Sequence, residues 1–267
     1  FAYPKQTDLD AILAAVVKDE PVYDFSADDG IQHTLWVVTD PAFCEAVPRL
    51  FAEKVANTYV ADGHHRTAAG ALVGKELREA NPNHNGTEGY NYFMAVLFPD
   101  DQLSIIDYNR VVKDLNGHSP AAFLQALEQG FEVTLKGTEI YKPVSLHEMS
   151  MYLEGKWYVL TAKGNTYDDN DPIAVLDVTI LSEQVLEPLL GITDLRRDKR
   201  IDFVGGIRGL GELSRRVDNG EMAVAFALYP VSMKQLIDIA DGGMIMPPKT
   251  TWFEPKLRSG LVVHVMD

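Results

Sequence analysis

The sequence contains a single cysteine, Cys44, among its 267 residues. One thiol cannot close a disulfide within the chain, and it cannot supply the several thiolates of a cysteine-based zinc site. Basic residues are also scarce, since 24 Lys and Arg stand against 39 Asp and Glu, giving a formal net charge of −15. A chain this acidic lacks the basic face that non-specific nucleic-acid binding needs, so we expect no nucleic-acid partner.

Long apolar runs are missing as well. No stretch of about 18 apolar residues is present, so we expect no membrane span and no membrane partner. The chain starts at Phe1 without a basic segment and an apolar signal core, which predicts a cytoplasmic protein whose upstream segment is missing. What is present is ordinary for a globular chain: 46% hydrophobic and 24% charged residues.

Strand and helix patterns alternate along the chain, which predicts an α+β fold with a mixed, partly antiparallel sheet. We expect strands at 33–39, 58–61, 92–98, 103–112, 157–161 and 222–228, and helices at 11–18, 43–54, 64–80, 119–129, 180–190 and 232–240. The length favours about two domains. We place a phosphate-binding portion at 1–116 and a second α/β portion at 117–267, with 243–267 returning to the site.

Local signals support several of these boundaries. The tight turn between 92–98 and 103–112 predicts antiparallel pairing of those two strands. Ser119, followed by a proline, is typical of a helix start. Two pairs have the spacing of a capping box, namely Ser145 with Glu148 and Ser232 with Gln235.

The strongest motif is VADGHHRTAA at 60–69, in which an apolar strand leads through an Asp-Gly turn into a helix. The first amides of a helix lack carbonyl partners and carry partial positive charge. Gly63 has no Cβ to hold an anion away from them, and His65 and Arg66 add side-chain donors. This pattern predicts a phosphate site. In the alternative interpretation, Asp62 is a helix cap and one histidine is packed or solvated.

A phosphotransferase also needs a base for the acceptor hydroxyl and cations for the developing charge. Asp62, beside the turn, is our candidate for that base or for a Mg²⁺ ligand, and His64 is a second candidate catalytic residue. Successive helical residues point about 100° apart, so His64 and His65 do not share a face.

Two further cations are candidates for binding a cofactor. Arg110, near the end of an expected strand, has the shape of a phosphate or carboxylate clamp. Lys249 lies in the string MPPKTT, where two prolines stiffen the backbone and preorganise the lysine. The alternative for Lys249 is a solvated side chain on a rigid edge loop.

The strings ADGHHR, HTLWVV and MPPKTTWFEPKLRSGLVV, together with Asp28 and Gly30, resemble a large prokaryotic family. It is catalogued as domain of unknown function one thousand and fifteen, and the resemblance covers nearly the whole chain. Members usually carry more sequence before this start, which agrees with the expected missing segment.

The strand–Gly–x–(His/Arg)–Arg–helix arrangement is also similar, more distantly, to the ParB, sulfiredoxin and free serine kinase superfamily. This resemblance implies a ParB/sulfiredoxin-like core in which Gly63, His65 and Arg66 hold nucleotide phosphates. The cofactor it implies is ATP or ADP, with CTP as a further option, together with Mg²⁺. The reactive cysteine of sulfiredoxin falls on His64, so we expect no sulfinic acid reduction.

Three functions follow in order of preference. The first is a nucleotide-dependent phosphotransferase, kinase-like, acting on a small-molecule substrate that carries a hydroxyl. The second is a nucleotide-binding sensor or scaffold without catalysis. The third is a metal-dependent phosphoesterase with Asp62, His64 and His65 as ligands, which ranks last because no second ligand cluster is evident. The oligomeric state is not readable from the sequence.

Overall fold

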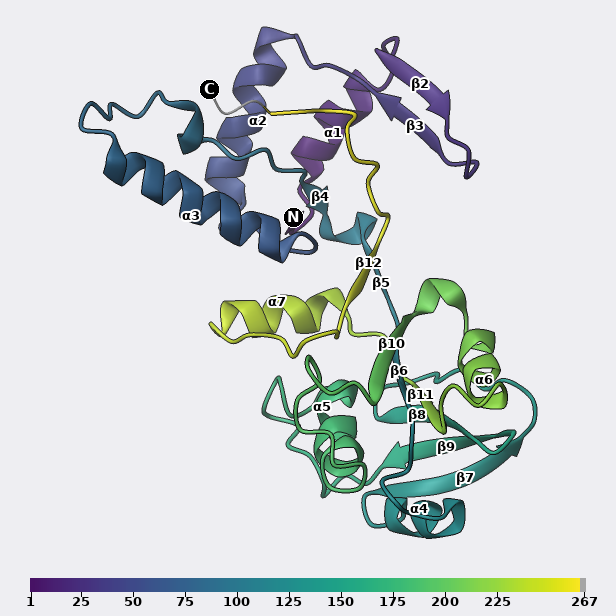
Figure 1. The fold of residues 1–267 in the computed structure, drawn as a ribbon. Helices are drawn as coiled ribbons and strands as arrows, with labels where there is room; N and C mark the ends of the chain where they lie inside the picture. Colours follow the sequence, from purple (N-terminus) through teal and green to yellow (C-terminus); the bar gives the residue numbers. More distant parts are fainter. Residues whose placement is uncertain (265–267) are drawn as a thin grey trace. The chain divides into compact units, whose positions relative to one another are not determined.

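The computed structural model describes residues 1–264 and divides the chain into two compact units (Figure 1). The first unit comprises Phe1–Leu103 and the described residues from Leu257 onward, and the second comprises Ser104–Lys256. The division after Leu103 falls earlier in the chain than the domain boundary predicted after residue 116. Helices accompany short, mostly antiparallel sheets, so the predicted α+β class is confirmed.

The first unit combines three α-helices with short strands among its described residues. The helices are α1 (Thr7–Val16), α2 (Pro41–Lys54) and α3 (His64–Ala80), and one-turn 3₁₀ helices span Gly89–Asn91 and Asp100–Gln102. The strands are β1 (Ala2–Tyr3), β2 (Tyr23–Ser26), β3 (Gln32–Leu35) and β4 (Phe98–Pro99). β1 pairs in parallel with β4, and β2 forms an antiparallel hairpin with β3.

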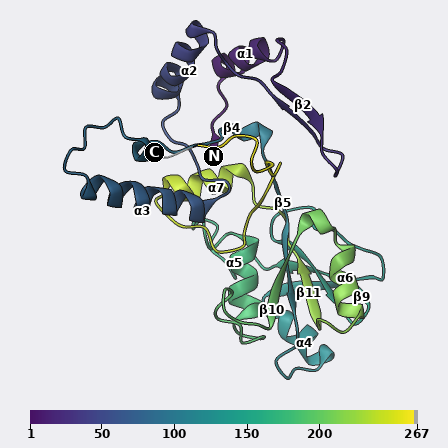
Figure 2. The ribbon, with the colours of Figure 1, turned by 45° about the horizontal axis from the view of Figure 1, so that its top comes forward.

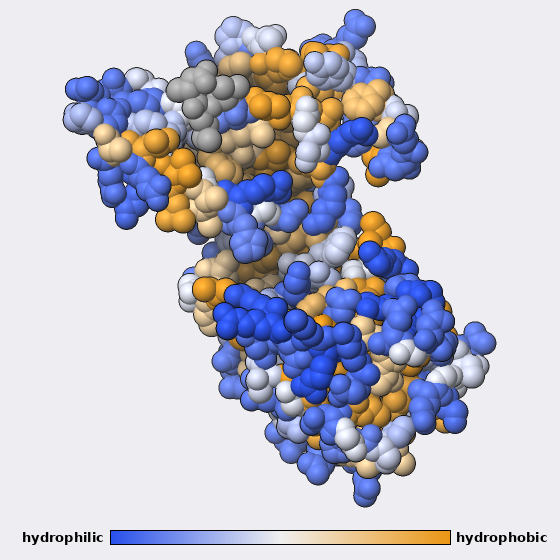
Figure 3. Space-filling view, in the orientation of Figure 1, coloured by the Kyte–Doolittle hydropathy of each residue, from blue (hydrophilic) through white to orange (hydrophobic). Residues whose placement is uncertain are grey.

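The approach to the predicted phosphate site in the first unit is buried. Ala2 and Tyr59 exchange two backbone hydrogen bonds of 2.8 Å, and Ala61 is buried two residues later. In contrast, α2 and α3 contain no buried residue. Figure 3 shows apolar surface along α3, where Leu72 and Val73 are exposed. The start of α3 is therefore held by the segment before it rather than by a buried helix face.

The second unit is built on a six-stranded antiparallel sheet in the order β10-β6-β11-β8-β9-β7. Its strands are β5 (Ser104–Ile106), β6 (Tyr108–Val112), β7 (Phe131–Gly137), β8 (Glu148–Leu153), β9 (Lys156–Ala162), β10 (Ile201–Gly205), β11 (Val224–Ala227) and β12 (Trp252–Glu254). Its helices are α4 (Pro120–Leu127), α5 (Asp177–Leu181), α6 (Gly211–Asp218) and α7 (Met233–Asp241), with a π turn at Ser182–Leu186 and a 3₁₀ turn at Gly206–Arg208. β5 pairs with β12 outside the main sheet.

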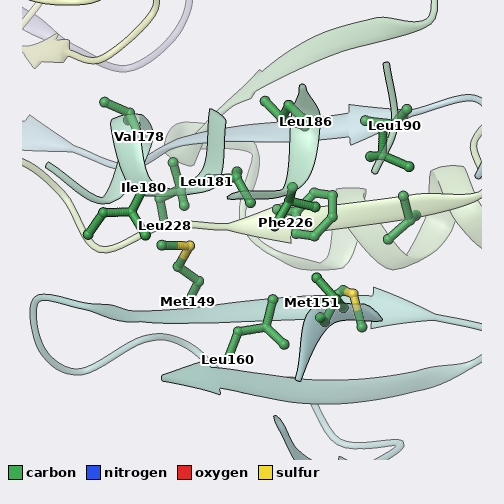
Figure 4. Packing of buried hydrophobic residues seen from close by; sticks show 14 of the residues in the cluster. Met149, Met151, Leu160, Val178, Ile180, Leu181, Leu186, Leu190, Phe226 and Leu228 are labelled. Carbon is green, nitrogen blue, oxygen red and sulfur yellow. The ribbon is translucent and has the colours of Figure 1, made fainter. Parts of the chain in front are cut away.

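Side chains alternate along each strand, so the two faces of this sheet carry different apolar clusters. On β11, Val224 and Phe226 join one apolar cluster, whereas Ala225 and Ala227 join the other. Figure 4 shows the larger cluster, in which residues of β8, β9 and β11 pack against the segment 178–190. The smaller cluster packs against Leu213 of α6, so α5 and α6 cover opposite sides of the strands (Figure 2). The second unit therefore has a complete core of its own.

The strand pair predicted at 92–98 and 103–112 is wrong. Only Phe98–Pro99 is a strand in the first segment, and it pairs in parallel with β1. The second segment is split into β5 and β6, which pair with β12 and with β10 and β11. The apolar residues of 92–97 are exposed, because apolarity alone does not supply a partner strand.

The predicted bounds of one helix and one strand, and three predicted helix starts, can be compared with the structure. α3 has the predicted bounds, and the expected strand at 33–39 ends at Leu35. The helix cap at Ser119 and the capping box of Ser232 and Gln235 are confirmed. The capping box at Ser145 and Glu148 is wrong, since Glu148 begins β8 and its carboxylate accepts a hydrogen bond of 3.0 Å from the Val144 amide.

Among residues 1–264, no helix combines the length and the apolar character needed to cross a bilayer.

Candidate functional site

The predicted phosphate site lies at the first turn of α3, which we call the α3 turn (Asp62–Arg66). Gly63 precedes the helix with φ 81° and ψ 29°, a left-handed conformation that favours glycine. The first helical hydrogen bond runs from the Thr67 amide to the Gly63 carbonyl at 2.9 Å. The amides of His64, His65 and Arg66 come before that bond and have no acceptor within the described part of the chain. These three amides are open donors within residues 1–264.

Arg66 places its guanidinium directly over this turn. A Cβ built on Gly63 would lie 3.0 Å from Nη2 and 3.1 Å from Nε of Arg66, so a larger residue there would make the guanidinium shift by a few tenths of an ångström. The side chains of His64, His65 and Arg66 are exposed. Arg66 makes no ion pair with any described carboxylate, which leaves its charge for an external anion. The turn thus joins open amides, a fixed positive charge and solvent access.

Asp62 does not cap α3. Its carboxylate accepts a hydrogen bond of 2.9 Å from the Gly63 amide, the residue directly after it, and no side chain accepts from the first-turn amides at the cap position. The alternative interpretation of Asp62 as a helix cap is therefore wrong. The carboxylate is exposed beside the turn, as the roles proposed for it from the sequence require.

The body of α3 uses its small residues to accept a close neighbour. A Cβ on Gly70 would lie 2.9 Å from the ring of Phe93, and one on Gly74 would lie 2.9 Å from the Tyr90 carbonyl oxygen. These glycines are one helical turn apart and face the same segment. The helix therefore packs against the 3₁₀ turn at Gly89–Asn91 and the chain that follows it. Glycine is needed at both positions to keep that segment in place.

A protein-built metal centre is not evident in residues 1–264, where no group of three or more His, Cys, Asp or Glu side chains is positioned to hold an ion. Asp62, His64 and His65 therefore do not form the three-ligand cluster that the phosphoesterase hypothesis assigns to them. Asp62 remains a single exposed carboxylate next to a turn suited to anions.

The second unit brings together two other residues predicted from the sequence, Arg110 and Lys249. Nη2 of Arg110 donates a hydrogen bond of 3.0 Å to the Lys249 carbonyl, and Nη1 donates to the Tyr108 carbonyl. The Cζ of Arg110 lies 5.5 Å from the ring centroid of Phe203, and Nζ of Lys249 lies 6.0 Å from the same centroid. Arg110 is fully buried, and desolvation lowers its pKa to about 9.

The structure also pairs two residues that sequence reasoning missed, His147 and Asp177. Nδ1 of His147 lies 3.4 Å from Oδ1 of Asp177, and the His147 amide donates to that oxygen at 2.8 Å. His147 has φ 66°, and its ring stacks on Tyr167 at 4.3 Å. Burial raises the pKa of Asp177 to about 7 and lowers that of His147. No spacing signal links two residues thirty positions apart on a turn and a helix.

A family model described as "Protein of unknown function (DUF1015)" matches residues 1–179. No curated protein matches the chain. Among solved structures, a free serine kinase variant in complex with AMP is 14% identical, with a TM-score of 0.37, over 94% of this chain and 82% of that chain. The same variant in complex with ADP has 14% identity, a TM-score of 0.36 and the same coverage. A conserved hypothetical protein from Pyrococcus furiosus is 14% identical, with a TM-score of 0.37, over 94% of this chain and 85% of that chain.

Proposed function

Because the chain belongs to the DUF1015 family, whose function is unknown, we propose an activity from its own residues. It binds the phosphates of a nucleotide at the α3 turn and transfers the terminal phosphoryl group to a small hydroxyl compound. The observation that carries the proposal is the exposed Arg66 guanidinium held over Gly63, beside three open amides. Helix-start amides and a guanidinium are complementary to phosphate oxygens in both charge and geometry.

The remaining residues of the turn have roles consistent with this chemistry. The hydroxyl oxygen of the acceptor would bond to the terminal phosphorus as the bond to the nucleotide's bridging oxygen breaks, and Asp62 would take the hydroxyl proton. His65 would add a donor to the phosphates, and His64, on another face of the helix start, would contact the reacting groups. Any Mg²⁺ would find one carboxylate in Asp62, since this ion takes few protein ligands when phosphates complete its shell.

The first test is calorimetry of the full chain with ATP, ADP and CTP, each with and without Mg²⁺. Arg66→Ala should weaken binding of the preferred nucleotide by about 1.5–3 kcal/mol, the range of a charge-assisted hydrogen bond to a charged group. Arg78→Ala is the matched control, because Arg78 lies in the last turn of the same helix and is also exposed. Circular dichroism would verify that both variants are folded.

Equal nucleotide affinity of wild type and folded Arg66→Ala would refute nucleotide binding at this turn. Catalysis needs a second readout, in which nucleotide turnover is followed with and without a panel of small hydroxyl compounds, serine among them. Acceptor-dependent turnover that is lost in Asp62→Asn supports the phosphotransferase. Tight nucleotide binding without turnover for any acceptor would support the sensor or scaffold instead.

A further inference from the structure

The second unit contains a buried cation that no described carboxylate neutralises. Arg110, on β6, has no exposed surface, and its Nε has no hydrogen-bond partner among the described atoms. By contrast, the more exposed Arg200, Arg215 and Arg216 of the same unit each form ion pairs with Asp or Glu side chains. A buried charge without a counter-charge is costly, and an anion that reached it would remove part of that cost.

The nearest acidic residue along the strand does not serve as that counter-charge. Asp107 is itself buried, and its carboxylate accepts a hydrogen bond of 2.5 Å from Nδ2 of Asn109. A Cβ on Gly206 would lie 2.4 Å from Oδ1 of Asp107, which places this carboxylate against the start of the 3₁₀ turn after β10. Nη1 and Nη2 of Arg110 each donate to a backbone carbonyl oxygen instead, so its Nε–H is left without an acceptor among the described atoms.

Lys249 brings a second positive charge to the same place. Its backbone has φ 59°, and the buried Thr250 hydroxyl donates to the Pro247 carbonyl at 2.7 Å, which closes the turn around it. A left-handed conformation in a lysine costs free energy, and such strain is often kept where a side chain must be aimed. Nζ of Lys249 lies 5.8 Å from the ring centroid of Tyr108, and the side chain is exposed.

A hollow lies next to this turn in the second unit. The hollow, of about 570 Å³, is lined by Thr193–Arg197 and by Pro248, the residue before Lys249. Two of its lining residues, Arg196 and Arg197, are exposed cations. The hollow is also lined by Asp194, whose carboxylate lies 3.8 Å from Nε of Arg197, so Arg196 is the lining cation without an ion pair among the described residues.

We propose that Arg110 and Lys249 form a site for a small oxyanion, a carboxylate or a phosphate, over the rings of Tyr108 and Phe203. The exposed Lys249 ammonium would contact the anion on its solvent side, and the Nε–H of Arg110 would donate to it from the buried side. The rings leave an apolar surface beside the charges, on which the rest of a ligand can pack. The site belongs to the second unit alone and does not depend on the function proposed for the α3 turn.

The test is equilibrium dialysis of the full chain with radiolabelled inorganic phosphate, with acetate as competitor. Both proposed sites can take phosphate, so the measurement is made in wild type and in Arg66→Ala, where the α3 turn is disabled. In the Arg66→Ala background, Lys249→Met and Arg110→Met should each weaken phosphate binding at least tenfold. Lys142→Met removes another exposed lysine of the same unit and should leave it unchanged.

The outcomes separate the two proposals. Phosphate bound to Arg66→Ala and lost on Lys249→Met supports the site, and competition by acetate extends its ligand class to carboxylates. Absence of phosphate binding in the Arg66→Ala background, or equal binding after Lys249→Met, overturns the proposed Arg110–Lys249 site. Neither result bears on nucleotide binding at the α3 turn. If Arg110→Met does not fold, Lys249→Met alone tests the site. This substitution should not affect folding, because Lys249 is exposed and does not pack in the core.

Discussion

Asp177→Asn is expected to remove a large pH dependence from the stability of the second unit. Asp177 is 3% exposed, one of its carboxylate oxygens has no partner in the described structure, and burial raises its pKa from 3.8 to about 7. The folded state therefore binds a proton between these values that the unfolded state releases. For such a raised pKa, the stabilising contribution is complete below pH 3.8 and is lost as the pH rises through 7.

The size of the effect follows from the two pKa values. Each pH unit between them costs about 1.4 kcal/mol, so the whole loss is about 4 kcal/mol, of which about 2.5 kcal/mol falls between pH 5 and pH 8. Asn keeps the acceptor for the His147 amide but carries no charge, and it should not show this loss. The lowered pKa of His147 acts in the opposite direction, since its contribution is lost as the pH falls.

The assay is urea unfolding at pH 5 and pH 8, followed by the fluorescence of Trp157, which is fully buried in this unit. We expect the difference in unfolding free energy between Asp177→Asn and wild type to shift in favour of the variant by about 2.5 kcal/mol from pH 5 to pH 8. Glu187→Gln, an exposed carboxylate in the same region, serves as the control and should show no such shift. A pH-independent difference for Asp177→Asn would refute the burial argument.

Two further substitutions test local backbone conformations. Glu154 and Gly155 form the two-residue turn between β8 and β9 with φ 47° and 74°, so Glu154→Asn should raise the free energy of unfolding by about 0.5–1 kcal/mol, because Asn accepts this conformation more readily. A lower value in urea unfolding would contradict this assignment of strain. Gly63→Ala places a Cβ 3.0 Å from the Arg66 guanidinium at φ 81°, and we expect a loss of about 1 kcal/mol in stability together with weaker nucleotide binding by calorimetry. Unchanged affinity would show that the Arg66 position over the turn is not needed for the ligand.

Much of the fold could be predicted where the signal is local. The bounds of α3 follow from the Asp-Gly turn and from Asn81-Pro82 at its end, and the start of α7 follows from the spacing of Ser232 and Gln235. Strand pairing could not be predicted in the same way, because β5 finds its partner in β12 at the far end of the second unit. The apolar segment 92–97 looked like a strand, but within residues 1–264 no strand pairs with it, and the Val96 carbonyl accepts only from the amino group of Phe1.

The candidate sites also differ in whether their residues are close together in the sequence. The α3 turn is contiguous in sequence, so its glycine, arginine and open amides could be inferred from five residues. Arg110 and Lys249 were each singled out, but their hydrogen bond spans 139 positions and no pattern in the sequence connects them. His147 carried no signal at all, since its relation to Asp177 depends on how the turn before β8 meets the start of α5.

The lack of buried side chains on α2 and α3 has a consequence for the motions of the first unit. A helix without a buried face gains little from tertiary packing. We therefore expect a low free energy of local unfolding for α2 and α3, and fast exchange of their amide hydrogens. A nucleotide held at the first turn of α3 binds only the closed helix, and at a concentration of about 100 times its Kd it would stabilise that form by about 2.7 kcal/mol. If the proposed nucleotide binds there, deuterium uptake along α3 would slow roughly a hundredfold, so the stability of the helix would report occupancy of the turn.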